Sequence, residues 1–362
     1  MNAVQFAVIR TLILVLFLTS TCLSNEQSQQ KGPGISACNY YASSNGSILP
    51  VSKLPQECTS FVWDGLFADV RNNVQYGFED ASKANEVDLL LKSSKPVYVY
   101  YGYTNMEIWT YVLGCGDCDG YIAIRESMKG LKAYMNVHPG IKGLILCQFE
   151  PDENSKPFPK YTEKLKTYIN IMKESFPNLE VGIVFYGNTI TDYYADPKIE
   201  WLDIKVLREV VDFFSISILR FNNCSLNSRI NSITPVDGNG KYTLTKLNQV
   251  LKKHGFPSRK LYFSTNLYPT NTETSFMPWN TTYQQICTNS SAARNLCKDN
   301  TLSFYQKGQF FRKNGCGFIA AYVDYADPLG KCGCGRPFAP FYDILDGFKG
   351  IKAPDPCPRM DG

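Results

Sequence analysis

Short apolar runs alternate with longer helical stretches along almost the whole chain, and this alternation constrains the fold more than any other feature of the sequence. Several runs are unbroken series of Val, Ile, Leu, Phe and Tyr, which is typical of parallel strands covered on both faces. The pattern predicts eight strands, at Ile35–Tyr41, Thr59–Val70, Pro96–Tyr103, Gly143–Phe149, Val181–Tyr186, Val211–Leu219, Lys260–Thr265 and Phe318–Val323.

The segments between these runs have helical periodicity. The clearest predicted helix is Tyr161–Phe176, and Tyr121–Asn136 and Leu244–His254 are also predicted to be helical, the last ended by Gly255 and Pro257. Eight strands with intervening helices predict an α/β fold, a single (β/α)₈ TIM barrel. A doubly wound open sheet is the alternative. No Gly-x-Gly-x-x-Gly follows a strand, so no dinucleotide site is indicated and we expect no cofactor.

The first two dozen residues have the composition of a secretory signal peptide. Arg10 precedes the apolar run Leu12–Leu18, and small and polar residues follow to Ser24. The run is shorter than the roughly 20 apolar residues that span a bilayer, and no later segment is long and apolar enough. We therefore expect a secreted, extracellular protein without a membrane span. The expected divisions are a signal peptide at 1–24, a polar segment at 25–34, the barrel at 35–352 and a C-terminal tail at 353–362.

The cysteines agree with an oxidising compartment. Of the 13 in the chain, Cys22 would leave with the signal peptide, and we expect the remaining even set to be mostly paired in disulfides. Cys147 lies within a predicted buried strand and is expected to stay free, which would leave an odd cysteine elsewhere. The pairs Cys115-Gly-Asp-Cys118 and Cys332-Gly-Cys334 permit a zinc or thioredoxin-like interpretation. The chain has only 2 histidines, however, and we expect no metal.

The surface chemistry excludes one class of partner and suggests one modification. The net charge of +4 is spread without a basic stripe or block, so we expect no nucleic-acid partner. Four Asn-x-Ser/Thr motifs are candidate glycosylation sites, although such short motifs also occur by chance; they begin at Asn45, Asn223, Asn280 and Asn289.

In a barrel of this kind, chemistry lies on the loops at the carboxyl ends of the strands. Glu150 is the notable residue there, because it ends an otherwise uncharged strand. Desolvation would raise its pKa and suit it to act as a general acid. The alternative is a rim carboxylate held by a backbone amide or a lysine, and periodicity alone does not separate the two.

Seven segments resemble, in the right order, strands of glycoside hydrolase family 18, the chitinase and chitinase-like family. The family's opening cysteine pair forms a disulfide, so the resemblance implies Cys38–Cys58. Lys142–Pro151 stands where the family carries its signature, Asp-Gly-x-Asp-x-Asp-Trp-Glu. The other segments are Trp63 on the second strand, Tyr101–Asn105 on the third, Val211–Phe221 on the sixth, Arg259 onward on the seventh and Gly317–Cys332 on the eighth.

The resemblance implies an active site that has lost most of its anionic groups. The family's general acid matches Glu150. In this family the substrate's acetamido group attacks the anomeric carbon, and losing a charge that stabilises the resulting cation costs ~3 kcal/mol, or on the order of a hundredfold in rate. Arg220 is predicted to pair with Glu150 and hold it ionised. The positions that depart from the family pattern are Gly143, Leu146 and Gln148 in the signature and Ser217, Leu219 and Arg220 on the sixth strand.

The resemblance also has implications for the substrate-binding groove that chitinases carry at the mouth of the barrel. The Trp that floors the family's pocket falls at Ala321 or Tyr322. Many chitinases insert a small domain between the seventh and eighth strands; here Asn266–Cys316 leaves little room beside a helix near Leu302–Arg312, so we expect a disulfide-tied loop and a shallow cleft. Rings at strand ends are candidate platforms for sugar stacking, with core packing as the alternative for each; these are Trp63, Tyr103, Trp109 and Tyr322.

The sequence is compatible with three hypotheses about function. The leading hypothesis is a secreted chitinase-like protein that binds chitin or N-acetylglucosamine-containing glycans with little or no hydrolysis. The first alternative is a weak or re-specialised glycoside hydrolase that uses Glu150 as general acid with a second carboxylate from Asp152, Glu153 or Asp324. The second is an extracellular interaction or signalling scaffold without a sugar site. The oligomeric state is not predicted.

Overall fold

A computed structural model describes residues 31–40, 49–69, 74–76, 86–114, 120–150, 160–194, 202–219, 221–224, 232–271, 282–288 and 296–361. Several predictions fall outside these residues and stay predictions. They concern the signal peptide, three of the four sequons and the residues Cys115, Cys118, Asp152, Glu153 and Arg220.

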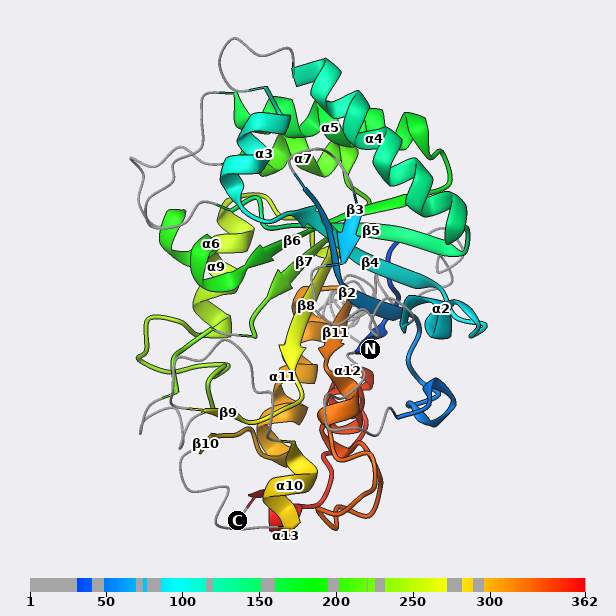
Figure 1. Ribbon diagram of the computed structural model, residues 1–362. Helices are drawn as coiled ribbons and strands as arrows, with labels where there is room; N and C mark the ends of the chain where they lie inside the picture. The colour runs from blue at the N-terminus through cyan, green and yellow to red at the C-terminus, as the bar shows by residue number, and fades with distance from the viewer. Residues whose placement is uncertain are drawn as a thin grey trace, which may run out of the picture.

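Eight parallel strands close into a barrel (Figure 1). Neighbours around it are β1, β11, β8, β7, β6, β5, β4 and β2, and β1 pairs with β2 to complete the ring. All eight predicted strands are present, so the TIM barrel is confirmed and the open sheet is excluded. The strands are β1 (Ser36–Tyr40), β2 (Phe61–Ala68), β4 (Val97–Tyr103), β5 (Ile141–Cys147), β6 (Glu180–Tyr186), β7 (Phe213–Ser217), β8 (Leu261–Asn266) and β11 (Gly317–Ala321), and β3 (Val74–Tyr76) extends β2 as an antiparallel arm.

Helices cover the outside of the barrel, with α4 and α5 on one side and α11 and α12 on the opposite side in Figure 1. The three helices predicted from periodicity and the one expected near residues 302–312 are confirmed as α5, α4, α9 and α11. The main helices are α2 (Glu86–Leu91), α3 (Met106–Val112), α4 (Gly120–Val137), α5 (Tyr161–Ser175), α6 (Gly187–Tyr193), α7 (Ile204–Val210), α9 (Leu244–Lys253), α11 (Thr301–Asn314) and α12 (Ala339–Lys349).

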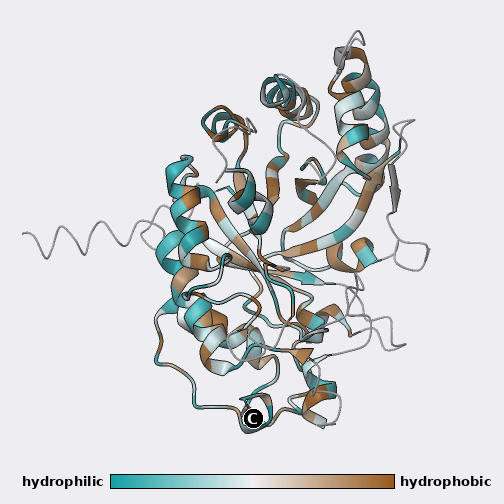
Figure 2. Ribbon diagram, turned by 90° about the vertical axis from the view of Figure 1, so that its left-hand side faces the viewer, coloured by the Kyte–Doolittle hydropathy of each residue, from teal (hydrophilic) through white to brown (hydrophobic). Residues whose placement is uncertain are grey.

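Alternating side chains divide the core into two layers. On β5, Ile145 and Cys147 belong to the cluster inside the barrel, whereas Leu144 and Leu146 belong to the larger layer between the strands and the helices. Figure 2 shows hydrophobic colour along the strands and mixed colour on the surrounding helices. This alternation decides which residue of each strand faces the barrel mouth.

The amino end of the barrel is closed by charges and rings. Glu180 is buried at the start of β6, where it accepts hydrogen bonds from Gly32 N (2.7 Å) and the Tyr98 hydroxyl (2.8 Å). Asp212, also buried, pairs with Lys31 (3.1 Å) and Lys173 (2.8 Å). The segment before β1 is thereby tied beneath the barrel.

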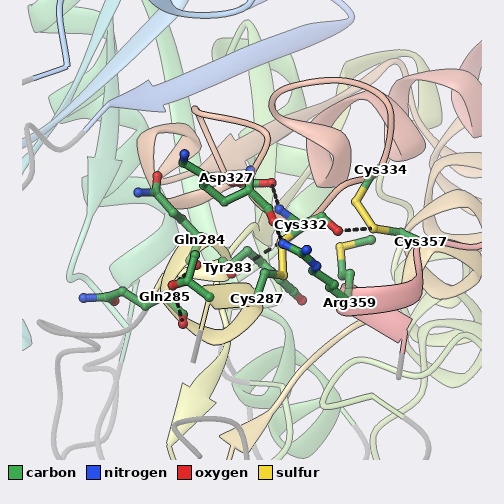
Figure 3. Close-up of a disulfide and its surroundings, with 12 residues drawn as sticks. Tyr283, Gln284, Gln285, Cys287, Asp327, Cys332, Cys334, Cys357 and Arg359 are labelled. Atoms are coloured by element: carbon green, nitrogen blue, oxygen red, sulfur yellow. Dashed lines mark hydrogen bonds between the residues drawn. A yellow bond between two sulfur atoms is a disulfide. The ribbon is translucent and has the colours of Figure 1, made fainter. Parts of the chain in front are cut away.

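Four disulfides link the described residues, and the pair implied by the family resemblance, Cys38–Cys58, is confirmed. The others are Cys224–Cys297, Cys287–Cys332 and Cys334–Cys357. Because Cys332 and Cys334 are each in a disulfide, the zinc interpretation of that motif is wrong (Figure 3). Cys147 is free, as expected, and Cys316 is the second free thiol in the described residues.

The connection between β8 and α11 is the expected disulfide-tied loop. Its described parts hold the two-residue strands β9 (Thr270–Asn271) and β10 (Leu296–Cys297) and the helix α10 (Tyr283–Thr288), while α13 (Pro358–Asp361) contacts α10. Figure 3 shows how Cys287 reaches Cys332, whose N–H donates to Asp327 Oδ2 at 2.8 Å. Within the part of the chain that the structure describes, no helix combines the length and apolarity needed to cross a bilayer.

Helices α11 and α12, which flank the closure of the barrel, cross at Gly308 and Gly347. A Cβ on Gly347 would overlap the Tyr305 carbonyl oxygen, and one on Gly308 would overlap the Ile344 carbonyl oxygen. We predict that Gly347→Ala lowers the free energy of unfolding by about 1–3 kcal/mol, since neither helix backbone can move away easily. Chemical denaturation measures the effect. Gly240→Ala is the control because nothing lies within 4 Å of its added Cβ, and equal stability of the two variants would contradict the packing argument.

Candidate functional site at the barrel mouth

A cavity of about 280 Å³ lies at the carboxyl ends of the barrel strands. It is lined by residues from all eight parallel strands or from the positions that directly follow them. This is the end of the barrel at which TIM-barrel proteins carry their sites. The described lining residues are Asn39, Asp64, Gly65, Phe67, Tyr100, Cys147, Gln148, Val184, Tyr186, Ser217, Leu219, Ser264, Ala321 and Tyr322.

Asp64 supplies the one carboxylate among these lining residues. The pairing of β2 with β4 shifts register between Trp63 and Leu66, and Gly65 at this bulge has φ 106°. Bulges commonly re-aim side chains beside functional sites. Burial raises the pKa of Asp64 to about 6, while hydrogen bonds from Tyr322 and Asn39 act in the opposite direction. Asp64 was not predicted from the sequence, although an acid between the apolar residues of the predicted strand was its visible signal.

Asn39 on β1 and Tyr322, which directly follows β11, hold Asp64. The Tyr322 hydroxyl donates to Asp64 Oδ2 at 3.3 Å, and Tyr322 N donates to Asn39 Oδ1 at 3.3 Å. Tyr322 has φ 54°, a left-handed conformation that is uncommon for a bulky residue and concentrates at functional sites. Its ring packs against Tyr268, with centroids 5.3 Å apart, and Tyr325, at 6.1 Å. The aromatic cluster therefore supports the residue that reaches Asp64.

The other polar groups described below that line the cavity are neutral. Burial, and then the charge of Asp64, raise the pKa of the Tyr100 hydroxyl, and the same two causes raise the pKa of the Cys147 thiol. Both groups therefore stay protonated at neutral pH. Ser217 Oγ is buried and has no hydrogen-bond partner among the described residues. Gln148 lines the cavity from a left-handed backbone conformation, φ 61°.

Glu150 is not among the described residues that line the cavity. Its Oε1 accepts a hydrogen bond from Tyr186 N at 2.8 Å, just before α6. Burial raises the pKa of Glu150 well above its ordinary value, with the Tyr186 amide and the Thr189 side chain opposing the rise. Both features considered from the sequence are therefore present: the Glu150 carboxyl group is desolvated, and a backbone amide donates a hydrogen bond to it.

The other signature positions are divided between the two layers of the barrel. Leu146 belongs to the outer layer against the helices, while its neighbour Cys147 faces the cavity. A Cβ on Gly143 would lie 2.7 Å from both the Glu180 carbonyl oxygen and the Tyr98 ring, so an aspartate has no room there. Ser217 and Leu219, the two described sixth-strand positions, line the cavity.

Three of the four predicted sugar platforms are core residues. Trp63, Tyr103 and Trp109 are each at most 1% exposed. Trp63 Nε1 donates to Glu86 Oε2 at 3.2 Å, and Trp109 Nε1 donates to the Cys147 carbonyl oxygen at 2.9 Å. Core packing, the alternative noted for each ring, describes all three. Tyr322 alone of the four lines the cavity, where Tyr100, Tyr186 and Phe67 join it.

The remaining predictions about the site concern Asn223, Asp324 and a bound metal. Asn223 is exposed beside the disulfide-bonded Cys224, and its glycosylation stays a prediction. Asp324 is buried and does not line the cavity described above. Among the residues in the described ranges, no group of three or more His, Cys, Asp or Glu side chains could hold a metal ion.

Comparison with solved structures places this barrel beside chitinases. The second catalytic domain of the group II chitinase of Ostrinia furnacalis superposes with a TM-score of 0.68 at 14% identity, covering 90% of this chain and 99% of that one. The chain has the barrel fold of family 18 chitinases. Human YKL-39, described as a pseudo-chitinase with retained chitooligosaccharide binding, gives 0.64 at 13% identity over 88% and 100%.

A family 18 chitinase from Cycas revoluta in complex with allosamidin gives a TM-score of 0.62 at 14% identity, covering 87% of this chain and 99% of that one. No protein-family model matches the sequence, and no curated protein matches it. The similarity to family 18 is thus one of fold, and the site must be argued from the residues of this chain.

We predict that Tyr322→Phe raises the pKa of Asp64 above its value of about 6, because the variant loses a hydroxyl that donates to the ionised carboxylate. Carboxyl-carbon NMR of the labelled protein across pH 4–8 would follow the titration. Tyr111→Phe, an exposed ring on α3, is the control. An unchanged Asp64 titration in Tyr322→Phe would show that this hydrogen bond is not made in solution.

Proposed function

We propose that this is a secreted chitinase-like protein that binds chitin or N-acetylglucosamine-containing glycans with little or no hydrolysis. The observation that carries the proposal is the chemistry of the mouth cavity. It combines aromatic rings, from Tyr100, Tyr186, Tyr322 and Phe67, with neutral hydrogen-bonding groups. Sugar-binding sites use this combination, because rings cover the apolar faces of a pyranose while polar groups fix its orientation.

The same cavity argues against efficient hydrolysis. Glycoside hydrolysis commonly uses two carboxyl groups that flank the scissile bond. Among the described lining residues Asp64 is the one acid, whereas Glu150 accepts a hydrogen bond from a backbone amide and does not line the cavity. Gln148 adds no charge to stabilise a developing cation. A bound glycan would therefore be held without the groups that speed its cleavage.

Secretion is supported by the cysteines and by the start of the chain. Disulfides persist in oxidising compartments, and this chain has four between its described residues. The apolar run Leu12–Leu18 has the length and flanks of a signal peptide. Asn223, exposed within an Asn-x-Ser motif, is the glycosylation site that the described surface supports.

Titration calorimetry with chitooligosaccharides of four or more units tests the binding. We predict that Tyr186→Ala weakens binding by about tenfold, or ~1.4 kcal/mol, because this ring is 41% exposed at the cavity, where a sugar can stack on it. Tyr111→Ala, whose ring is 56% exposed on α3 and away from the cavity, should bind as the parent does. No binding at millimolar oligosaccharide would remove the glycan proposal and leave the interaction scaffold.

A weak glycosidase that uses Glu150 as acid is the second candidate, and the raised pKa of Glu150 through burial favours it. We predict instead that Glu150→Gln leaves any residual hydrolysis of chitooligosaccharides unchanged, since Glu150 Oε1 accepts a hydrogen bond from Tyr186 N and the residue does not line the cavity. Product analysis by mass spectrometry after long incubation measures both proteins. Turnover by the parent that disappears in Glu150→Gln would establish the glycosidase.

A further inference from the structure

We infer that the mouth cavity binds a sugar unit with a free amine, so that the glycan recognised is a partly deacetylated chitin whose ammonium group pairs with Asp64. The inference rests on the proposed function and names the sugar unit that the cavity selects. It follows from the charge of the Asp64 carboxylate, its hydrogen-bond partners and its position in the cavity.

The charge of the cavity is unbalanced. Asp64 is the one formally charged side chain among its described lining residues, and it stands among Phe67, Val184, Leu219 and Ala321. A carboxylate removed from water is costly unless a cation or several hydrogen bonds compensate it. No lysine or arginine is among the described lining residues. A ligand that carries a positive charge would supply the missing partner.

The protein satisfies Asp64 only in part. An ionised carboxylate accepts about four hydrogen bonds, and the described donors to Asp64 are Tyr322, at 3.3 Å, and Asn39. An ammonium group brings three N–H donors. One can meet Asp64, and the buried, unpartnered Ser217 Oγ and the Gln148 side chain on the same cavity are acceptors for others. An acetamido group has one N–H and no charge, and its methyl group takes space in a cavity of about 280 Å³.

The titratable side chains around Asp64 are neutral, so Asp64 is the described group that can form an ion pair with an ammonium. Tyr322 faces it from the end of β11, Tyr100 from β4 and Cys147 from β5. Burial raises the pKa of Tyr100 and of Cys147, so both are neutral at physiological pH. Because burial also raises the pKa of Asp64 to about 6, this acid becomes ionised as the pH rises from 4 to 6, where the amine of a glucosamine unit stays protonated. Binding of an ammonium should strengthen by at least tenfold over that interval.

The experiment is calorimetry on the mature chain with two tetrasaccharides of equal length, one of glucosamine and one of N-acetylglucosamine. At pH 7 the parent protein should bind the glucosamine tetramer at least tenfold more tightly. Asp64→Asn should lose this preference. Asp355→Asn, an exposed aspartate on the C-terminal segment, should keep it and so controls for general attraction of a polycation.

Three results would overturn the inference. They are equal or tighter binding of the acetylated tetramer by the parent, an unchanged preference in Asp64→Asn, or glucosamine-tetramer affinity in the parent that does not rise between pH 4 and pH 6. The pH comparison uses the parent alone, so it holds even where Asp64→Asn folds poorly. Binding of the acetylated tetramer without preference would leave the proposed function standing; binding of neither tetramer would remove both.

Discussion

The pairing of β1 with both β2 and β11 is the constraint on which the rest of the structure depends. Cys38 pairs with Phe61 on one side and with Ala320 on the other, and the Cys38–Cys58 disulfide ties the strand to the connection before β2. Closure in this way unites strands from the two ends of the chain. Asn39, Asp64 and Tyr322 meet only because of it, with 283 positions between the first and the last. Without closure there is no mouth cavity and no buried acid.

Two carboxylates at the mouth have separate environments because the backbone aims them differently. A bulge at Gly65 interrupts β2 and leaves Asp64 in the cavity, where a tyrosine and an asparagine hold it. Gln148 has a left-handed backbone conformation, which ends the alternation of side chains along β5. Glu150 accepts a hydrogen bond from the Tyr186 amide and does not line the cavity. Burial raises the pKa of both acids. The two acids therefore differ in position more than in pKa. Asp64 lines the cavity and is suited to bind a ligand, whereas Glu150 supports the fold.

The fold could be predicted because apolar runs and helical periods are local properties, and each of the eight runs became a barrel strand. The site could be predicted only in part. The family signature, carried over by counting residues, put Leu146 among the site positions, whereas Leu146 faces the helices and its neighbour Cys147 faces the cavity. Trp63 and Trp109 resembled surface platforms, but burial depends on packing against distant helices. Asp64 was missed because a bulge, which no periodicity reports, decides where its side chain points.

A crystal structure of the protein after soaking with a partly deacetylated chitin oligosaccharide tests the central claim most directly. The account predicts an intact oligosaccharide with one sugar unit in the mouth cavity, its nitrogen within hydrogen-bond distance of Asp64 and a ring face against Tyr186 or Tyr322. A cleaved oligosaccharide with its broken end at Glu150, or an occupied site elsewhere with the mouth cavity empty, would contradict it.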